Sequence, residues 1–392
     1  MSITLSWALF NSYVPIFLRA FVPSSALVGF VMSLDNVAGM TLQPWFGGRS
    51  DRTRTRFGRR MPYLMIGMPL AALAIPLLPQ APTLVALILA IIAFDLAMSV
   101  FRAPTVALMP DLTPGPYRSQ ANGIINFMGG LGALIAFFVG AALYRQDPAY
   151  PFFGASGMLM FALILLILVI REPDRAHMSD DDVPADGILR AVRRLPREDL
   201  PLLWTLLALF GWSLGQSAVE TFFTTYTVVS LGWNESTGAF LFGFFALAFL
   251  LSALPAGWVG ARWGQHATLA RGLIALAVIV GAAPLARSPV LIGAALALAG
   301  VAWGLVTVNA YPRIVQLGSE ETIGTSTGLY YFFTSLAAST GPPAAGAVMD
   351  LMGEAWLFGF SAVSFVAAWF CLRQAARSAA AVKNAGASQA VV

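Results

Sequence analysis

The chain has 392 residues, of which 58% are hydrophobic and 11% are charged, and its mean hydropathy is +0.75. Soluble domains carry about 25% charged residues, so a soluble protein of this composition would have too little polar surface to face water. The formal net charge of +4 does not indicate nucleic-acid binding, because the cations gather in short stretches between apolar segments. The composition therefore predicts an all-α polytopic membrane protein.

Apolar segments follow one another along the chain, and each has about the 20 residues that a membrane-spanning helix needs. We expect twelve such helices, over residues 3–21, 25–48, 61–79, 82–109, 117–144, 151–171, 198–230, 235–261, 266–286, 288–312, 322–350 and 353–375. The first begins at Ile3 with no charged stretch before it, which is not the pattern of a signal peptide. We therefore read it as a membrane helix, and we expect either that the chain starts upstream or that few residues precede this helix.

The distribution of cations orients these helices. Of the 23 Lys and Arg residues, 19 fall in loops and tails on one predicted side, three fall on the other side, and Arg102 falls inside a segment. In membrane proteins the cytoplasmic loops carry the excess of Lys and Arg. We therefore expect a multi-pass protein of the inner (cytoplasmic) membrane, with both termini in the cytoplasm.

The stretch from residue 43 to residue 62, QPWFGGRSDRTRTRFGRRMP, separates the second segment from the third. It holds six arginines against one carboxylate. Each cation would cost several kcal/mol in hydrocarbon, so we predict a loop in water on the cytoplasmic side. We expect its residues to act in gating and topology rather than as substrate ligands. The residues concerned are Asp51, Arg52, Gly58, Arg59 and Arg60.

Residues 172–197 form the long polar connection of the chain, acidic at its start and basic at its end. Apolar residues recur in it at helical spacing, at Ile188, Leu189, Val192 and Leu195. A short helix on the inner leaflet and a solvated linker both fit this pattern. We predict an N-terminal six-helix half (1–171), a cytoplasmic linker (172–197), a C-terminal six-helix half (198–375) and a cytoplasmic tail (376–392).

The two halves resemble each other in sequence. The string ANGIINF at 121–127 has a counterpart, STGLYYF, at 326–332, which is 205 residues later. Two parallel six-helix repeats, with a substrate site at their interface, account for such a pattern.

Ionisable residues inside apolar segments are costly, so each is a functional candidate by default. They are Asp35 in the second segment, Asp95 and Arg102 in the fourth, and Glu220 in the seventh. Asp95 and Arg102 share one helix face with an axial rise of about 10.5 Å between them. We expect both to line one cavity, and we weigh a role in substrate binding or proton coupling against a purely structural polar cluster. Asp111 lies near the end of the fourth segment, where contact with water explains it.

Asp35 also has two interpretations. Burial favours the neutral form of a carboxyl group, so this residue could load and release a proton. Alternatively it forms structural hydrogen bonds to neighbouring helices or to Arg102. Asn11 and Asn126 are weaker candidates for the substrate site, because Asn inside a membrane often bonds one helix to another.

A family resemblance rests on the string Gln43-Pro44, Gly47, Ser50-Asp51-Arg52, Gly58-Arg59-Arg60 and Pro62. It resembles the loop between helices 2 and 3 of major facilitator transporters, and it is most similar to the sucrose-transporter branch and the related glycoside–pentoside–hexuronide symporters. The fourth segment also resembles helix 4 of the sucrose transporters, although Arg102 lies about one turn earlier than their arginine. The resemblance implies the major facilitator fold, with twelve transmembrane helices in two six-helix repeats.

The resemblance further implies a secondary transporter that takes up a sugar or glycoside with protons by alternating access. Gln43 stands where the melibiose-type relatives carry an Asp of their sodium site, so we expect a proton as the coupling ion. Gln216 and Glu220, one turn apart, would either bond to sugar hydroxyls or bond one helix to another. The open alternative is proton-driven efflux of a small molecule, although the fifth segment lacks the proline of the antiporter motif G-P-x2-G.

Few other partners are expected. One cysteine and two histidines leave almost no material for a metal site, and no G-x4-G-K-[ST] phosphate loop supports coupling to ATP. An enzyme is disfavoured, because no His-rich cluster, Ser–Lys dyad or extramembrane catalytic domain is visible. We expect a monomer in the lipid bilayer that binds a small-molecule substrate and a proton, without a cofactor.

Overall fold

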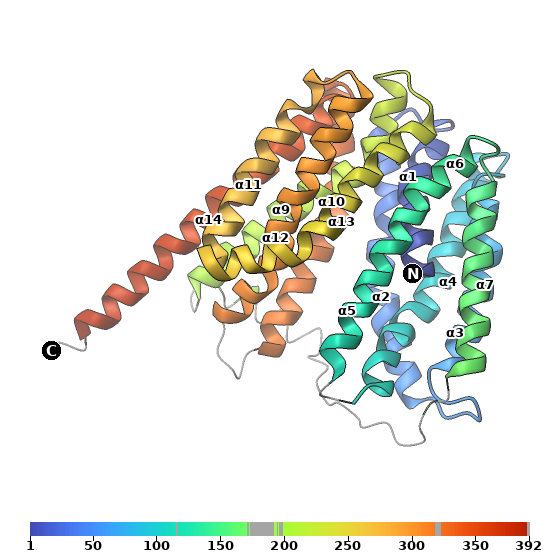
Figure 1. The fold of residues 1–392 in the computed structure, drawn as a ribbon, viewed down its shortest axis with the longest axis horizontal. Helices are drawn as coiled ribbons and strands as arrows, with labels where there is room; N and C mark the ends of the chain where they lie inside the picture. Colours follow the sequence, from blue (N-terminus) through green and yellow to red (C-terminus); the bar gives the residue numbers. More distant parts are fainter. Residues whose placement is uncertain are drawn as a thin grey trace. The chain divides into compact units, whose positions relative to one another are not determined.

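The computed structural model describes residues 1–114, 117–170, 199–317 and 323–389, together with Glu172, Val192, Arg193 and Leu195. The described residues form helices, and the one β-bridge among them joins Thr55 to Gly58 (Figure 1). Within these ranges, nine helices are long and apolar enough to cross a membrane, judged by length and composition. The predicted all-α membrane fold is confirmed.

Each of the twelve predicted segments contains a helix. The first six segments become α1 (Ser2–Arg19), α2 (Ser25–Arg52), α3 (Met61–Ala74) with the 3-10 turn η1 (Ile75–Leu77), α4 (Leu84–Leu112), α5 (Arg118–Leu134) with the π-helix η3 (Ile135–Gly140) and α6 (Ala141–Tyr144), and α7 (Tyr150–Val169). The last six become α9 (Leu200–Val229), α10 (Glu235–Trp263), α11 (Gln265–Ala282) with the 3-10 turn η4 (Ala283–Leu285), α12 (Pro289–Leu317), α13 (Ile323–Met352) and α14 (Trp356–Gln389).

The second helix is longer than the sequence predicted. We expected a loop from residue 43, but α2 continues through Asp51 to Arg52 and ends at Thr53, so the loop covers residues 53–60. Arg49 and Arg52 lie in the last helical turn, where cations interact favourably with the carbonyl end of the helix dipole. The start of the charge cluster therefore did not mark the end of the helix. At the other end of the chain, α14 continues beyond residue 375 to Gln389.

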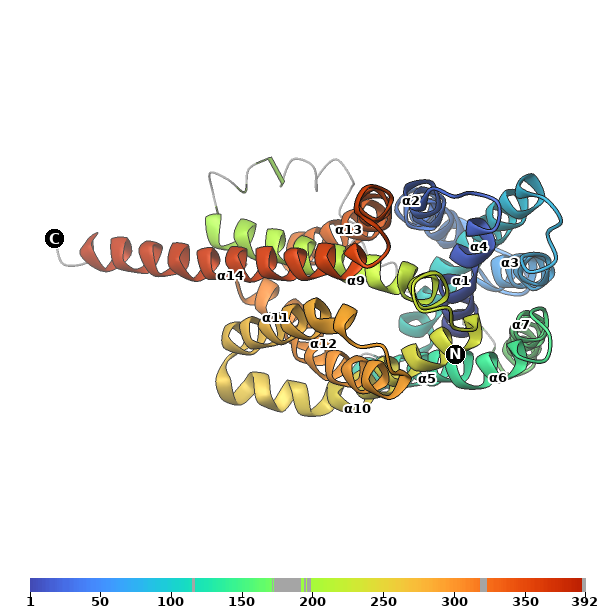
Figure 2. The ribbon, with the colours of Figure 1, turned by 90° about the horizontal axis from the view of Figure 1, so that it is seen from above.

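Contacts divide the chain into two compact units. Unit 1 contains Met1–Met178 and Thr221–Ala246, and unit 2 contains Ser179–Glu220 and Leu247–Val392. Helices α9 and α10 therefore contribute residues to both units. In unit 1, α1 lies among α2, α4, α5 and α7 (Figure 2). The predicted division at residues 171 and 198 stays a prediction, and the predicted linker helix lies outside the described residues except at positions 192, 193 and 195.

The same close helix contact occurs once in each unit. A side-chain carbon at Gly67 of α3 would lie 2.8 Å from the Phe101 side chain and 3.1 Å from the carbonyl oxygen of Ala97 on α4. A side-chain carbon at Gly272 of α11 would lie 2.8 Å from Val306 and 3.1 Å from the carbonyl oxygen of Ala302 on α12. Each residue of the second set follows its counterpart by 205 residues, the spacing of the sequence repeat. The two repeats therefore share a helix-packing geometry.

This contact generates a stability prediction. We expect Gly67→Ala and Gly272→Ala to lower the melting temperature of the purified protein in detergent, because overpacking a close contact costs about 1–3 kcal/mol. The matched control is Gly154→Ala on α7, since no atom lies within 4 Å of the position of its added carbon. Alanine favours a helix over glycine, so the control should melt no lower than the unsubstituted protein. Equal melting of all three variants would contradict the close-contact argument.

Candidate functional site

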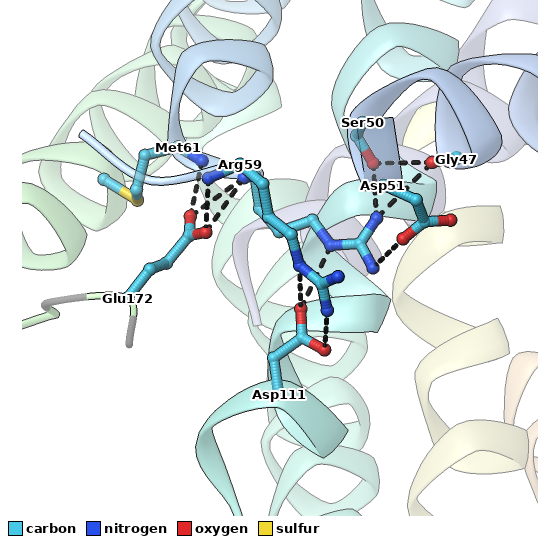
Figure 3. Close-up of polar contacts among 8 residues, drawn as sticks. Gly47, Ser50, Asp51, Arg59, Met61, Asp111 and Glu172 are labelled. Atoms are coloured by element: carbon cyan, nitrogen blue, oxygen red, sulfur yellow. Dashed lines mark hydrogen bonds and ion pairs between the residues drawn. The ribbon is translucent and has the colours of Figure 1, made fainter. Parts of the chain in front are cut away.

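Arg60 is the centre of a polar cluster at one end of unit 1, which we call the loop cluster: Ser50, Asp51, Arg59, Arg60, Asp111 and Glu172 (Figure 3). The Arg60 side chain is only 5% exposed. It donates to the Asp111 carboxylate at 3.1 Å and to the Ser50 hydroxyl at 2.5 Å, and it forms an ion pair with Asp51. One arginine thus joins the end of α2 and the end of α4 to the start of α3.

Asp111 on α4 is shared by two arginines. Arg59 donates to its two oxygens at 2.5 Å and 3.3 Å, in addition to the bond from Arg60. The side chain of Asp111 is 12% exposed. The prediction that water explains Asp111 was therefore wrong, because the two arginines replace that water. Charge-assisted bonds of this forked kind fix orientation as well as adding energy.

Glu172 caps the start of α3. Its carboxylate accepts hydrogen bonds from the backbone N–H groups of Arg59 at 2.7 Å, of Arg60 at 3.0 Å and of Met61 at 2.7 Å (Figure 3). The first N–H groups of a helix have no partner within the helix, and α3 has no side-chain cap at Arg60. A negative charge at this end is also stabilised by the helix dipole.

Gly58 makes room for that cap. Its φ of +102° favours glycine, and a side-chain carbon there would lie 2.5 Å from the Glu172 carboxyl carbon. Sequence reasoning identified Gly58 but missed Glu172, which it assigned to the acidic start of the linker. One signal was available, because α3 begins without the Ser, Thr, Asp or Asn that usually caps a helix. Such a helix needs an acceptor from elsewhere in the chain.

A second polar cluster lies within the helices of unit 1, and we call it the helix cluster: Trp7 on α1, Asp35 on α2, and Asp95 and Arg102 on α4. The guanidinium carbon of Arg102 lies 5.5 Å from the centre of the Trp7 ring. The Asp35 carboxylate interacts electrostatically with both Asp95 and Arg102. Three of the residues that the sequence analysis selected are therefore coupled electrostatically through Asp35, although they come from two helices.

Two polar atoms of the helix cluster are buried without a hydrogen-bond partner among the described residues. They are the Asp95 carboxyl oxygen Oδ1 and the Trp7 indole nitrogen Nε1. Buried polar groups in proteins are nearly always hydrogen-bonded, so an unmatched donor and an unmatched acceptor need an explanation. Oδ1 of Asp35, in contrast, accepts from the backbone N–H and the side-chain amide of Asn36, both at 2.6 Å.

Aromatic rings form one side of the helix cluster. Trp7 packs edge-on against Phe10 at 5.3 Å and against Phe94 at 5.5 Å, and Phe10 stacks on Phe94 at 5.3 Å between ring centres. The position of Trp7 in this cluster could not be predicted, because a single Trp in an apolar segment carries no sign of its neighbours. The cluster combines apolar ring faces, a cation, two carboxyl groups and an indole donor. Such a combination can bind a ligand that has both hydroxyl groups and apolar faces.

The remaining predicted residues lie on α1, α2, α5 and α9. Asn11 is half-buried on α1, and Asn126 is exposed on α5, where it donates to the Asn122 carbonyl of its own helix at 3.0 Å. Gln216 and Glu220 lie on α9 in unit 2, the first buried and the second exposed. Arg52 is exposed at the end of α2.

Comparison with known proteins gives a consistent result. The family model of the Major Facilitator Superfamily matches residues 1–342. An isoprimeverose transporter of Lactiplantibacillus pentosus is 24% identical over 377 residues, which cover 89% of this chain and 76% of that protein. The class B tetracycline resistance protein of Escherichia coli is 25% identical over 266 residues, covering 67% of this chain and 64% of that protein.

A crystal structure of the nucleoside transporter NupG is similar in fold, with a TM-score of 0.72 at 14% identity, over 95% of this chain and 96% of that one. Because the family model covers most of the chain, and because these relatives are transporters, the earlier resemblance is confirmed. The chain belongs to the major facilitator superfamily, and it is a transporter and not an enzyme.

Proposed function

We propose that this transporter takes up a sugar or glycoside together with protons, by alternating access, and that the helix cluster binds the substrate. One observation carries the proposal: a buried acceptor on Asp95 and a buried donor on Trp7, whose ring lies against Arg102, have no hydrogen-bond partner among the described residues. A sugar hydroxyl donates one hydrogen bond and accepts others, so it matches this pair. The relative named for isoprimeverose transport supports the sugar class.

The ring faces support the same substrate class. The C–H faces of a sugar ring are apolar, and they pack against aromatic rings such as that of Trp7, which the fully buried rings of Phe10 and Phe94 hold in place. Arg102 would donate to hydroxyl oxygens while its stacking on Trp7 holds the guanidinium in place. A binding site of few polar groups within an apolar wall is the usual arrangement for small molecules.

Proton coupling follows from the charges of the helix cluster. With Asp35 and Asp95 both ionised, the cluster with Arg102 carries one net negative charge, and one bound proton makes it neutral. Charge that lacks compensation is costly inside a membrane, so substrate binding and protonation would favour each other. One elementary charge moving through 100 mV supplies about 2.3 kcal/mol. At about 1.4 kcal/mol per tenfold change, this supports roughly 50-fold accumulation of a neutral solute.

We further propose that the loop cluster acts as a gate on the cytoplasmic side, in a monomer of the inner membrane with both termini in the cytoplasm. Asp51 is 43% exposed, whereas its partner Arg60 is 5% exposed. This ion pair can therefore break and re-form at the surface while the bonds of Asp111 and Glu172 keep α3 and α4 together.

Proton-driven efflux is the second candidate function, and the tetracycline resistance relative favours it. The two functions differ in direction. In whole cells that are given labelled disaccharide, a protonophore abolishes accumulation by an uptake symporter. The same protonophore raises the cell content of a substrate that an exporter removes.

The first prediction concerns Asp95. Asn resembles the protonated form of Asp, so Asp95→Asn should bind substrate and exchange it by counterflow in proteoliposomes, yet fail to accumulate it on a pH gradient. Asp35→Asn is the comparison, because Asp35 is the carboxylate whose charge acts on both Asp95 and Arg102. If Asp95→Asn still accumulates substrate and Asp35→Asn does not, the coupling carboxyl is Asp35.

The second prediction concerns the coupling ion. Uptake into proteoliposomes should increase when the outside is made more acidic, and it should not change when sodium replaces potassium at constant ionic strength. The reason is that Gln43 has a neutral amide where a sodium site would use a carboxylate. A strict requirement for sodium would contradict proton coupling.

The third prediction concerns the gate. Asp51→Asn should slow counterflow several-fold and leave the substrate Kd within a few-fold, because Asp51 belongs to the loop cluster and not to the helix cluster. Arg54→Ala is the control, since Arg54 is an exposed residue of the same loop. A large loss of substrate affinity with unchanged turnover would show that Asp51 belongs to the binding site.

A further inference from the structure

A second group of cations lies at one end of unit 2, where α11 begins and α12 ends. These two helices pack together, and the contact of Gly272 with Val306 sets their register. His266 lies six residues before Gly272 on α11, and Arg313 lies seven residues after Val306 on α12. Because the two helices are antiparallel, His266 and Arg313 lie at about the same height along them. The charge of Arg313 acts on His266. We call these two residues the cation pair.

The cation pair lacks the partners that unit 1 provides. The Arg313 nitrogen Nε and the His266 nitrogen Nδ1 are buried, and neither is hydrogen-bonded to a described residue. The loop cluster of unit 1 has ion pairs of Arg59 with Asp111 and of Arg60 with Asp51 and Asp111. A buried cationic donor without an acceptor is costly, which indicates that an anion completes this site.

The sequence repeat shows which residues of unit 2 stand where unit 1 has the ion pair of Arg60 and Asp111. The residue 205 positions after Arg60 is Gln265, and the residue 205 positions after Asp111 is Gln316. Amides thus replace the ion pair of unit 1, and Arg313 lies one turn before Gln316. In addition, α11 follows Gly264 with no side-chain cap, whereas α3 is capped by Glu172. Among the described residues, the start of α11 therefore has no carboxylate that corresponds to Asp111 or to Glu172.

The surroundings are those of a membrane surface. Arg271 lies over the Trp263 ring at 4.6 Å, and Arg373 lies over the Trp369 ring at 4.8 Å. Trp and Arg gather where membrane helices meet the headgroup region. The ligand that such surroundings supply to a half-buried arginine is a lipid phosphate, whose oxygens match the fork of donors on a guanidinium.

We propose that His266 and Arg313 bind a phosphate group, and that a phospholipid headgroup supplies it. Arg313 donates from its guanidinium to two phosphate oxygens, and His266 donates to a third when protonated. Further arginines are described in the helices that form this end of unit 2, namely Arg262, Arg271, Arg373 and Arg377, and the described carboxylate Asp199, which precedes α9, accepts from the Leu202 backbone N–H. The phosphate would therefore lower the repulsion among them as well as satisfy the buried donors.

The test measures the melting temperature of the purified full chain in detergent, with phosphatidylglycerol, phosphatidylcholine or inorganic phosphate added. We expect phosphatidylglycerol to raise the melting temperature of the unsubstituted protein. Arg313→Gln should lose most of this increase, and Arg313→Lys, which keeps the charge but not the fork of donors, should lose part of it. Arg262→Gln is the matched control, because Arg262 is an exposed cation at the same end of unit 2.

The outcomes separate the sources of the phosphate. An equal increase with inorganic phosphate alone would assign the same residues to a soluble phosphate, and an increase with either lipid but not with inorganic phosphate would assign them to a headgroup. Equal losses in Arg262→Gln and Arg313→Gln would overturn the proposal, because the lipid would then respond only to total charge. No increase with any phosphate would also overturn it. The double variant Glu320→Gln with Glu321→Gln tests whether carboxylates of the chain itself take the place of the phosphate. This variant should leave the increase in melting temperature with lipid unchanged.

Discussion

A charge inside hydrocarbon must have a partner, and this constraint accounts for the arrangement of polar residues in unit 1. The charges gather at two levels along the helices, in the loop cluster and in the helix cluster. Helix α4 contributes to both, with Asp111 at its end and with Asp95 and Arg102 further inside. Between the levels lies Pro104, which cannot donate a backbone hydrogen bond. Helix α4 thus connects the two clusters through a point where it can bend.

The two repeats keep their packing while they differ in charge. The glycines at 67 and 272 let α3 approach α4 and α11 approach α12 in the same way. In unit 1 the helix ends beside this contact are tied by carboxylates, whereas in unit 2 amides stand at the corresponding positions. Asn309 on α12 instead donates to the Ala256 carbonyl of α10 at 3.1 Å, which is a bond between helices of the kind that packs membrane proteins, and to the Leu305 carbonyl of its own helix at 2.9 Å.

The helices could be predicted from the sequence because length and hydropathy are local properties. The high cost of burying charge likewise selected Asp35, Asp95 and Arg102, and the structure brings these three residues together. What could not be predicted depends on contacts between distant parts of the chain. Asp111 lies 51 residues from Arg60, and Glu172 lies 111 residues from Met61. The π-helix at Ile135–Gly140 also left no mark in the hydropathy pattern.

The cap on α3 has a mechanical consequence. Glu172 follows α7 by three residues, yet its carboxylate is held by the backbone at the start of α3. A force that pulls on the chain after residue 172 would therefore act on the start of α3, through these hydrogen bonds, before it acted on α7. Hydrogen bonds to a charged group are each worth about 1.5–3 kcal/mol, and this anchor has bonds to three backbone N–H groups. The arginines of the loop hold the start of α3 in place, and the chain toward the second half of the protein leaves from this same point.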